Sequence, residues 1–208
     1  MTKKFAEEEK DYFSVQDTLL PEDRKLYTGG LYRQASRHNK VCDMLQPIGV
    51  QSVLDVGCGL SDLLPTLKAR NPTTLQRYQG CDIMPQFVSQ AAGRYKDMDG
   101  MAELTWSTST VFDLNKPDES FCAVVAIDIF TKFTDDYMGL LCTTVAEMWR
   151  LAKHAIVFTT LSPNMREKPK GTATVPDTEL LAIASRLSEK FELSRVNPPY
   201  VQTLAIYK

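Results

Sequence analysis

The chain has 208 residues, of which 43% are hydrophobic, so it is long enough to bury the core of one globular domain. Its formal net charge is −2 and its pI is about 5.8. Proteins that bind nucleic acid mainly through the phosphates carry an excess of positive charge, so the chain lacks a strong nucleic-acid signature. No segment reaches membrane-spanning length, and the N-terminus lacks the apolar run of a signal peptide. The five cysteines are odd in number and lack metal-ligand spacing, so we expect reduced thiols, no metal site, no membrane association and a cytoplasmic location.

The chain divides into two parts by its periodicity. Residues 1–30 are charged and show no clear period, so we predict an N-terminal extension followed by one domain over 31–208. The domain opens with a helix over 31–45, where apolar and small residues recur at helical spacing until Pro47 and Gly49 stop it.

Strands and helices alternate through the rest of the domain. An almost continuous apolar run over 121–127 is typical of a central strand that is buried on both faces. The two last strands surround Asn197-Pro198-Pro199, which predicts a closing hairpin. The predicted strands cover 51–56, 78–82, 103–107, 121–127, 155–160, 191–196 and 200–207. The predicted helices cover 62–70, 86–95, 137–151 and 178–190.

Two short motifs about twenty residues apart predict a nucleotide site. Residues 52–61 read Ser-Val-Leu-Asp-Val-Gly-Cys-Gly-Leu-Ser, an apolar strand that runs into a turn, where Gly57 and Gly59 allow the backbone to approach a ligand closely. Residues 78–83 read Tyr-Gln-Gly-Cys-Asp-Ile, and Asp82 ends this strand where a carboxylate can bind both ribose hydroxyls. The alternative is a glycine turn with no ligand.

Charge decides which nucleotide fits this turn. A dinucleotide fingerprint would have a third glycine at position 62, but the chain has Asp62, which together with Asp55 would repel a pyrophosphate. S-adenosylmethionine carries a sulfonium and an ammonium group in place of phosphates, so carboxylates attract it.

These motifs resemble those of class I S-adenosylmethionine-dependent methyltransferases, and more narrowly those of small bacterial and phage methyltransferases of unassigned substrate. The resemblance runs from about Tyr32 to the C-terminus, and Ser61 stands where the family usually has a further glycine. It implies an α/β, Rossmann-like three-layer sandwich. Its seven-stranded sheet would be mainly parallel, with a C-terminal antiparallel β-hairpin, and S-adenosyl-L-methionine would be the cofactor.

The resemblance also implies cofactor-binding residues. Arg37, in the segment before the first motif, would hold the methionine carboxylate, and a solvated helix face is the alternative. Near the adenine the family has an acidic residue, whereas this chain has Thr110, so Thr110, Val111 or Phe112 would replace that contact. The residues expected to bind the cofactor are Arg37, Asp55, Gly57, Gly59, Asp82, Ile83, Thr110 and Val111.

Asp128 is the predicted catalytic residue. It follows the apolar run at the carboxyl end of a central strand, where open α/β sheets bind their ligands, so its carboxylate can take a proton from the acceptor. The alternative is a helix cap or a turn residue. The chain lacks an Asn or Asp followed by Pro-Pro-Tyr at this point, which counts against the DNA enzymes that methylate amino groups.

We therefore expect a methyltransferase that acts on an unidentified acceptor, either a small molecule or a nucleotide-like compound. A loop that contains Arg166, Lys168 and Lys170 would suit an anionic acceptor, although a solvated linker has the same composition. One alternative is a binding or inhibitory partner of this fold without turnover. An aminopropyltransferase is a weaker alternative, because its decarboxylated cofactor would make no use of Arg37. The sequence does not indicate an oligomeric state.

Overall fold

The computed structural model describes residues 31–132, 134–165, 168, 170–196 and 200–208. The predicted extension over 1–30 and the predicted turn at 197–199 lie outside the described residues. Of the side chains within helices and strands, those of residues 31–33 and 196 are also not described.

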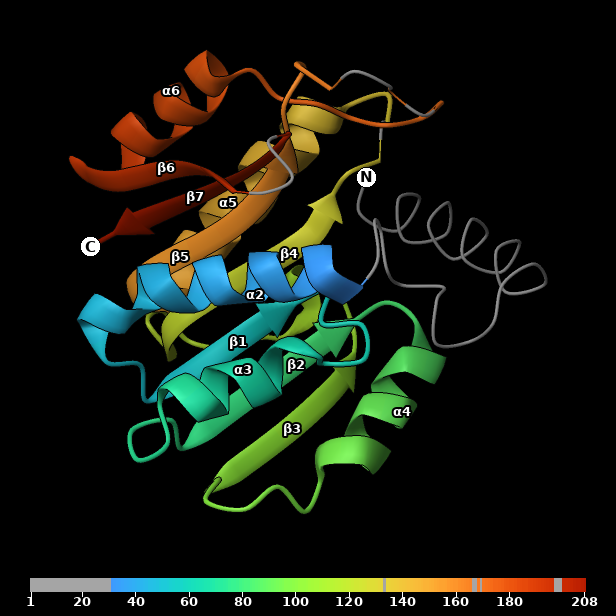
Figure 1. Cartoon of the computed structure of the whole chain (residues 1–208), viewed down its shortest axis with the longest axis vertical. Helices are drawn as coiled ribbons and strands as arrows, with labels where there is room; N and C mark the ends of the chain where they lie inside the picture. Colours follow the sequence, from blue (N-terminus) through green and yellow to red (C-terminus); the bar gives the residue numbers. More distant parts are fainter. Residues whose placement is uncertain (1–30, 133, 166–167, 169, 197–199) are drawn as a thin grey trace.

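Within the described residues, seven strands form one sheet in the order β3-β2-β1-β4-β5-β7-β6 (Figure 1). The first five strands in sequence pair in parallel, whereas β7 is antiparallel to both β5 and β6. The predicted Rossmann-like sheet with its closing hairpin is confirmed. The strands are β1 (Ser52–Val56), β2 (Arg77–Asp82), β3 (Glu103–Thr108), β4 (Phe121–Phe130), β5 (Ala152–Leu161), β6 (Lys190–Val196) and β7 (Val201–Tyr207).

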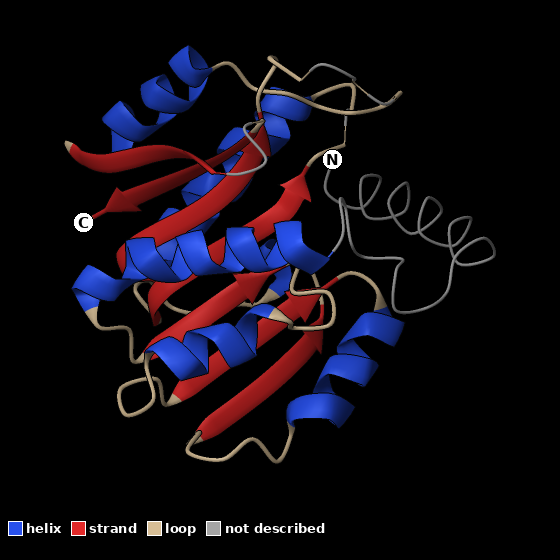
Figure 2. Ribbon diagram, in the orientation of Figure 1, coloured by secondary structure: helices blue, strands red, loops and turns tan. Residues whose placement is uncertain are grey.

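Helices cover both faces of the sheet, as Figure 2 shows. The helices are α2 (Leu31–Leu45), α3 (Leu63–Arg70), α4 (Pro85–Tyr95), α5 (Tyr137–Leu151) and α6 (Asp177–Leu187), with short 3-10 turns η1 (Gln46–Ile48) and η2 (Val111–Asp113). None of the helices in the described part of the chain combines the length and the apolar composition that crossing a bilayer requires.

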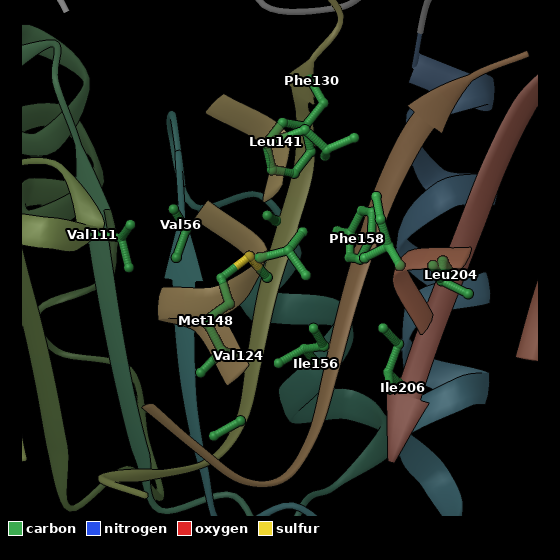
Figure 3. Close-up of a cluster of buried hydrophobic side chains, with 14 of the residues drawn as sticks. Val56, Val111, Val124, Phe130, Leu141, Met148, Ile156, Phe158, Leu204 and Ile206 are labelled. Atoms are coloured by element: carbon green, nitrogen blue, oxygen red, sulfur yellow. The ribbon is translucent and has the colours of Figure 1, made fainter. Parts of the chain in front are cut away.

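The core lies in two layers because successive strand residues point to opposite faces. Leu54 and Val56 of β1 join the cluster under α5 and α6, whereas Val53 joins the cluster under α2 and α3. Figure 3 shows the first cluster, in which Met148 of α5 packs against the side chains of the central strands. The central strands are therefore buried on both faces, as the apolar run over 121–127 predicted.

Three element boundaries differ from the predicted ones by three residues. β4 continues to Phe130 instead of ending at 127, because its pairing with β5 resumes at Phe130 and Thr160 after an irregularity. β5 starts at Ala152, three residues before the predicted start. α6 ends at Leu187 rather than 190, because Ser188 is extended and its hydroxyl accepts a hydrogen bond from the Lys190 N–H.

Candidate functional site

The turn after β1 is fixed by left-handed backbone and by hydrogen bonds to β2. Gly57 and Gly59 have φ of 68° and 52°. A β-carbon on Gly57 would lie 2.1 Å from Cγ2 of Ile129, so only glycine fits there. The N–H groups of Gly57 and Cys58 both donate to the carbonyl of Cys81, at 2.8 and 3.0 Å. The turn thus lies directly against the carboxyl end of β2.

Asp82 joins the two motifs. Its Oδ2 accepts a hydrogen bond from the Gly59 N–H at 2.9 Å, and its Oδ1 accepts one from the Met84 N–H at 2.9 Å. Burial raises the pKa of this carboxyl, while the N–H groups of Met84, Gly59 and Ile83 oppose that rise. An ionised carboxylate accepts about four hydrogen bonds, so the bonds from Gly59 and Met84 leave acceptor capacity for a ligand. Ile83 is half-buried and packs against Met84 and its neighbours.

Asp55 lies beneath the turn, not on an open rim. It is 3% exposed, and its Oδ2 accepts a hydrogen bond from the Tyr78 hydroxyl at 2.7 Å. Burial raises its pKa to about 7, the Tyr78 hydrogen bond works against this, and the charges of Asp82 and Asp62 add to it. The Asp55 carboxyl therefore lies below the backbone of the turn and does not line an open rim.

Ser61 occupies the position where the family usually has a glycine. It is fully buried with φ of 57°, and its Oγ accepts a hydrogen bond from Nε1 of Trp106 at 2.8 Å. The sequence analysis did not predict roles for Trp106 and Tyr78 in this region, because both look like ordinary strand aromatics. The hydrogen bond from Trp106 compensates for the unfavourable backbone of a non-glycine residue.

The charge of Asp62 is partly neutralised. Its carboxylate lies at the start of α3 and forms an ion pair of 2.8 Å with Arg94 of α4. The repulsion of a pyrophosphate expected from Asp62 is therefore weaker than the sequence suggests. Of the two carboxylates expected to repel a pyrophosphate, Asp55 is buried and Asp62 is paired with Arg94.

Arg37 and Asp128 lie together at the carboxyl end of β4. The Arg37 side chain is buried, and its Nη2 lies 2.8 Å from Oδ2 of Asp128, which excludes a solvated helix face. Asp128 has φ of 63°, and its N–H donates to Oγ1 of Thr159 at 2.8 Å. The helix-cap alternative is wrong, because Asp136 caps α5 by accepting a hydrogen bond from the Gly139 N–H.

His38 follows Arg37 on α2 and is also buried. Its pKa falls to about 4 because burial and the Arg37 charge outweigh the opposite effect of Asp62. The imidazole is therefore neutral at pH 7.

The segment after β3 lies beside Asp82. The Ser109 N–H donates to the backbone carbonyl of Asp82 at 3.0 Å. The Thr110 hydroxyl donates to Asp113 Oδ2 at 2.6 Å, and Val111 is buried in the core cluster under α5. The structure therefore brings the predicted adenine segment next to Asp82, with the Val111 side chain pointing into the core (Figure 3).

Comparison with known proteins agrees with this architecture. Residues 53–154 match the methyltransferase domain family. A search of curated protein sequences finds no match to the chain.

Several solved structures share the fold. The N-methyltransferase NodS from Bradyrhizobium japonicum WM9, in complex with S-adenosyl-L-homocysteine, has a TM-score of 0.71 at 16% identity, covering 94% of this chain and 97% of that one. Magnesium protoporphyrin IX methyltransferase ChlM from Synechocystis PCC 6803, with bound SAH, has a TM-score of 0.64 at 13% identity, covering 83% and 82%. The methyltransferase domain of bacterial CtHen1 has a TM-score of 0.63 at 14% identity, covering 84% and 99%.

The sheet order, the turn after β1 and the carboxylate that ends β2 define a methyltransferase fold. Together with the match of residues 53–154 to the methyltransferase domain family, they confirm the resemblance of the two motifs to those of class I S-adenosylmethionine-dependent methyltransferases.

Proposed function

We propose that this chain binds S-adenosyl-L-methionine across the carboxyl ends of β1, β2 and β4 and methylates a small-molecule or nucleotide-like acceptor. The observation that carries the proposal is the carboxylate of Asp82, which the Gly59 and Met84 N–H groups hold at the end of β2 with acceptor capacity left for a ribose. A turn and a carboxylate fixed in this way form a preorganised ribose site.

Each further part of the cofactor has a candidate partner. Gly57 and Gly59 let the backbone of the turn approach the cofactor. The segment with Thr110 and Val111, which the Ser109 N–H joins to Asp82, would contact the adenine. The guanidinium of Arg37 would bind the amino-acid carboxylate, for which its planar fork of donors is suited. When bound, the cofactor supplies an activated methyl group on a sulfonium.

The loop after β5 supports an anionic acceptor. The Ala173 N–H donates to the carbonyl of Thr131 at 3.0 Å, so this loop is attached near the carboxyl end of β4. It contains the exposed residues Lys168 and Lys170, and Lys132 pairs with the loop through a β-bridge to Thr172. Cationic side chains beside a methyl-transfer site favour acceptors with a phosphate or carboxylate.

The chain's contribution to the reaction would be alignment and exclusion of water, since the cofactor is already activated. The general-base role of Asp128 stays a prediction. Its ion pair with Arg37 opposes that role, because a carboxylate that takes a proton loses part of the attraction to the guanidinium. All five cysteines are free thiols, which agrees with the proposed cytoplasmic location.

Calorimetry with purified protein tests the cofactor. We expect binding of S-adenosylmethionine and S-adenosylhomocysteine but not of NAD, and equal or tighter binding of NAD would refute the proposal. Incubation with methyl-labelled cofactor and fractions of anionic metabolites and nucleotides then tests transfer. Binding without any labelled product would favour the alternative of a binding partner without turnover.

A further inference from the structure

The ion pair between Arg37 and Asp128 is unequally exposed. The Arg37 side chain is 3% exposed and the Asp128 side chain is 25% exposed, with Nη2 and Oδ2 2.8 Å apart. A guanidinium buried this deeply needs a charged partner, because an uncompensated charge inside a protein is costly. The carboxylate of Asp128 therefore sets where the Arg37 guanidinium lies, at the ligand edge of the sheet.

Asp128 is itself held rigidly. Its backbone φ of 63° is uncommon for a residue with a side chain and persists only where the surroundings fix it. Its N–H donates to Thr159 Oγ1 at 2.8 Å, and its carbonyl accepts a hydrogen bond from Thr131 Oγ1 at 3.0 Å. The next residue, Ile129, packs against the turn at Gly57. The carboxylate is thus presented from a fixed point beside the cofactor turn.

Arg37 comes from a separate element. It belongs to α2, which crosses the face of the sheet and packs on β4, β5 and β7 (Figure 1). A guanidinium carries five N–H donors in one plane, so it can bind two carboxylates at its different edges. A ligand carboxylate can therefore bind Arg37 while Asp128 still orients it.

We propose that Asp128 is a positioning residue that orients the guanidinium of Arg37 to bind the amino-acid carboxylate of S-adenosylmethionine. The inference rests on the proposed function and adds a specificity determinant to it. The Arg37–Asp128 pair makes the protein prefer the intact cofactor over decarboxylated S-adenosylmethionine, which keeps the sulfonium and the ammonium but lacks the carboxylate.

Calorimetric binding of these two ligands tests the role. The variant Asp128→Asn keeps the side-chain shape and tolerates a left-handed backbone. We expect its affinity for S-adenosylmethionine to fall about tenfold to a hundredfold, with that for the decarboxylated ligand changed by less than about threefold. The matched control is Glu192→Gln, which breaks the 2.8 Å ion pair from Lys40 of α2 to β6 and should leave both affinities unchanged.

Three results would overturn the positioning role. An equal loss of affinity for both ligands would mean that Asp128 binds the ammonium group or acts only on folding. Unchanged affinities with strongly reduced turnover would mean that it is the general base. If Asp128→Asn does not fold, the double variant Arg37→Met/Asp128→Asn removes both charges and should bind both ligands with similar affinity, so a retained preference for S-adenosylmethionine would refute the role.

The outcome for the wild-type protein separates the two proposals. A wild-type protein that binds neither ligand refutes the proposed function, and the positioning role with it. If the wild-type protein binds S-adenosylmethionine more tightly than the decarboxylated ligand and Asp128→Asn keeps that preference, the positioning role alone is refuted.

Discussion

The buried carboxyl of Asp55 offers a direct test of the electrostatics beneath the turn. The side chain is 3% exposed, and the Tyr78 hydroxyl donates a hydrogen bond to it. The variant Asp55→Asn keeps the size and shape of the side chain and an oxygen that accepts this hydrogen bond, but it cannot ionise. Its stability relative to wild type should therefore depend on pH.

The sign and size follow from the pKa. Burial raises the pKa of Asp55 from its ordinary 3.8 to about 7. Between these values the folded protein holds a proton that the unfolded chain has released, so the wild-type free energy of unfolding falls as pH rises and levels off above about 7. At about 1.4 kcal/mol for each pH unit, Asp55 costs wild type about 2–3 kcal/mol between pH 5 and pH 8. The free energy of unfolding of Asp55→Asn should not show this decrease, because an amide does not ionise.

Urea denaturation of both proteins at about pH 5 and pH 8, without cofactor, measures the difference. Any constant cost of the new amide cancels when the two pH values are compared. Other titrating groups, among them His38, are present in both proteins and largely cancel as well. The reasoning is refuted if the free-energy difference between variant and wild type stays constant within about 0.5 kcal/mol over this range.

Two further variants test the turn. Asp82→Ala removes the predicted ribose acceptor, so calorimetry should show cofactor binding weakened by roughly 1.5–3 kcal/mol in a protein that still folds, and unchanged affinity would exclude the ribose assignment. Gly57→Ala would place a β-carbon 2.1 Å from a β4 side chain, so we expect a loss of more than about 2 kcal/mol in urea denaturation. The control Gly49→Ala has a similar φ of 57° with no atom within 4 Å of the new carbon and should cost only about 1 kcal/mol. Equal losses in the two glycine variants would contradict the packing argument.

The sequence by itself determined the fold class and brought together the glycine turn and the carboxylate of the candidate site. A continuous apolar run predicts a central strand that is buried on both faces. A glycine turn after one strand and an acidic residue at the end of the next predict a nucleotide site, because the carboxyl ends of neighbouring parallel strands meet at one edge of the sheet. Gly57, Gly59 and Asp82 accordingly lie together. These features are local, so residue order and spacing are enough to reveal them.

The tertiary structure decided which side chains are partners. The pairs Arg37 with Asp128, Asp55 with Tyr78, and Ser61 with Trp106 join residues far apart in the chain. Their contacts depend on strand order, on register and on the irregularity that carries β4 past its apolar run. Periodicity reports which face a residue lies on, but not which residue of another element lies opposite. For that reason, the sequence suggested a base or a cap at Asp128, while the folded chain pairs it with a buried arginine.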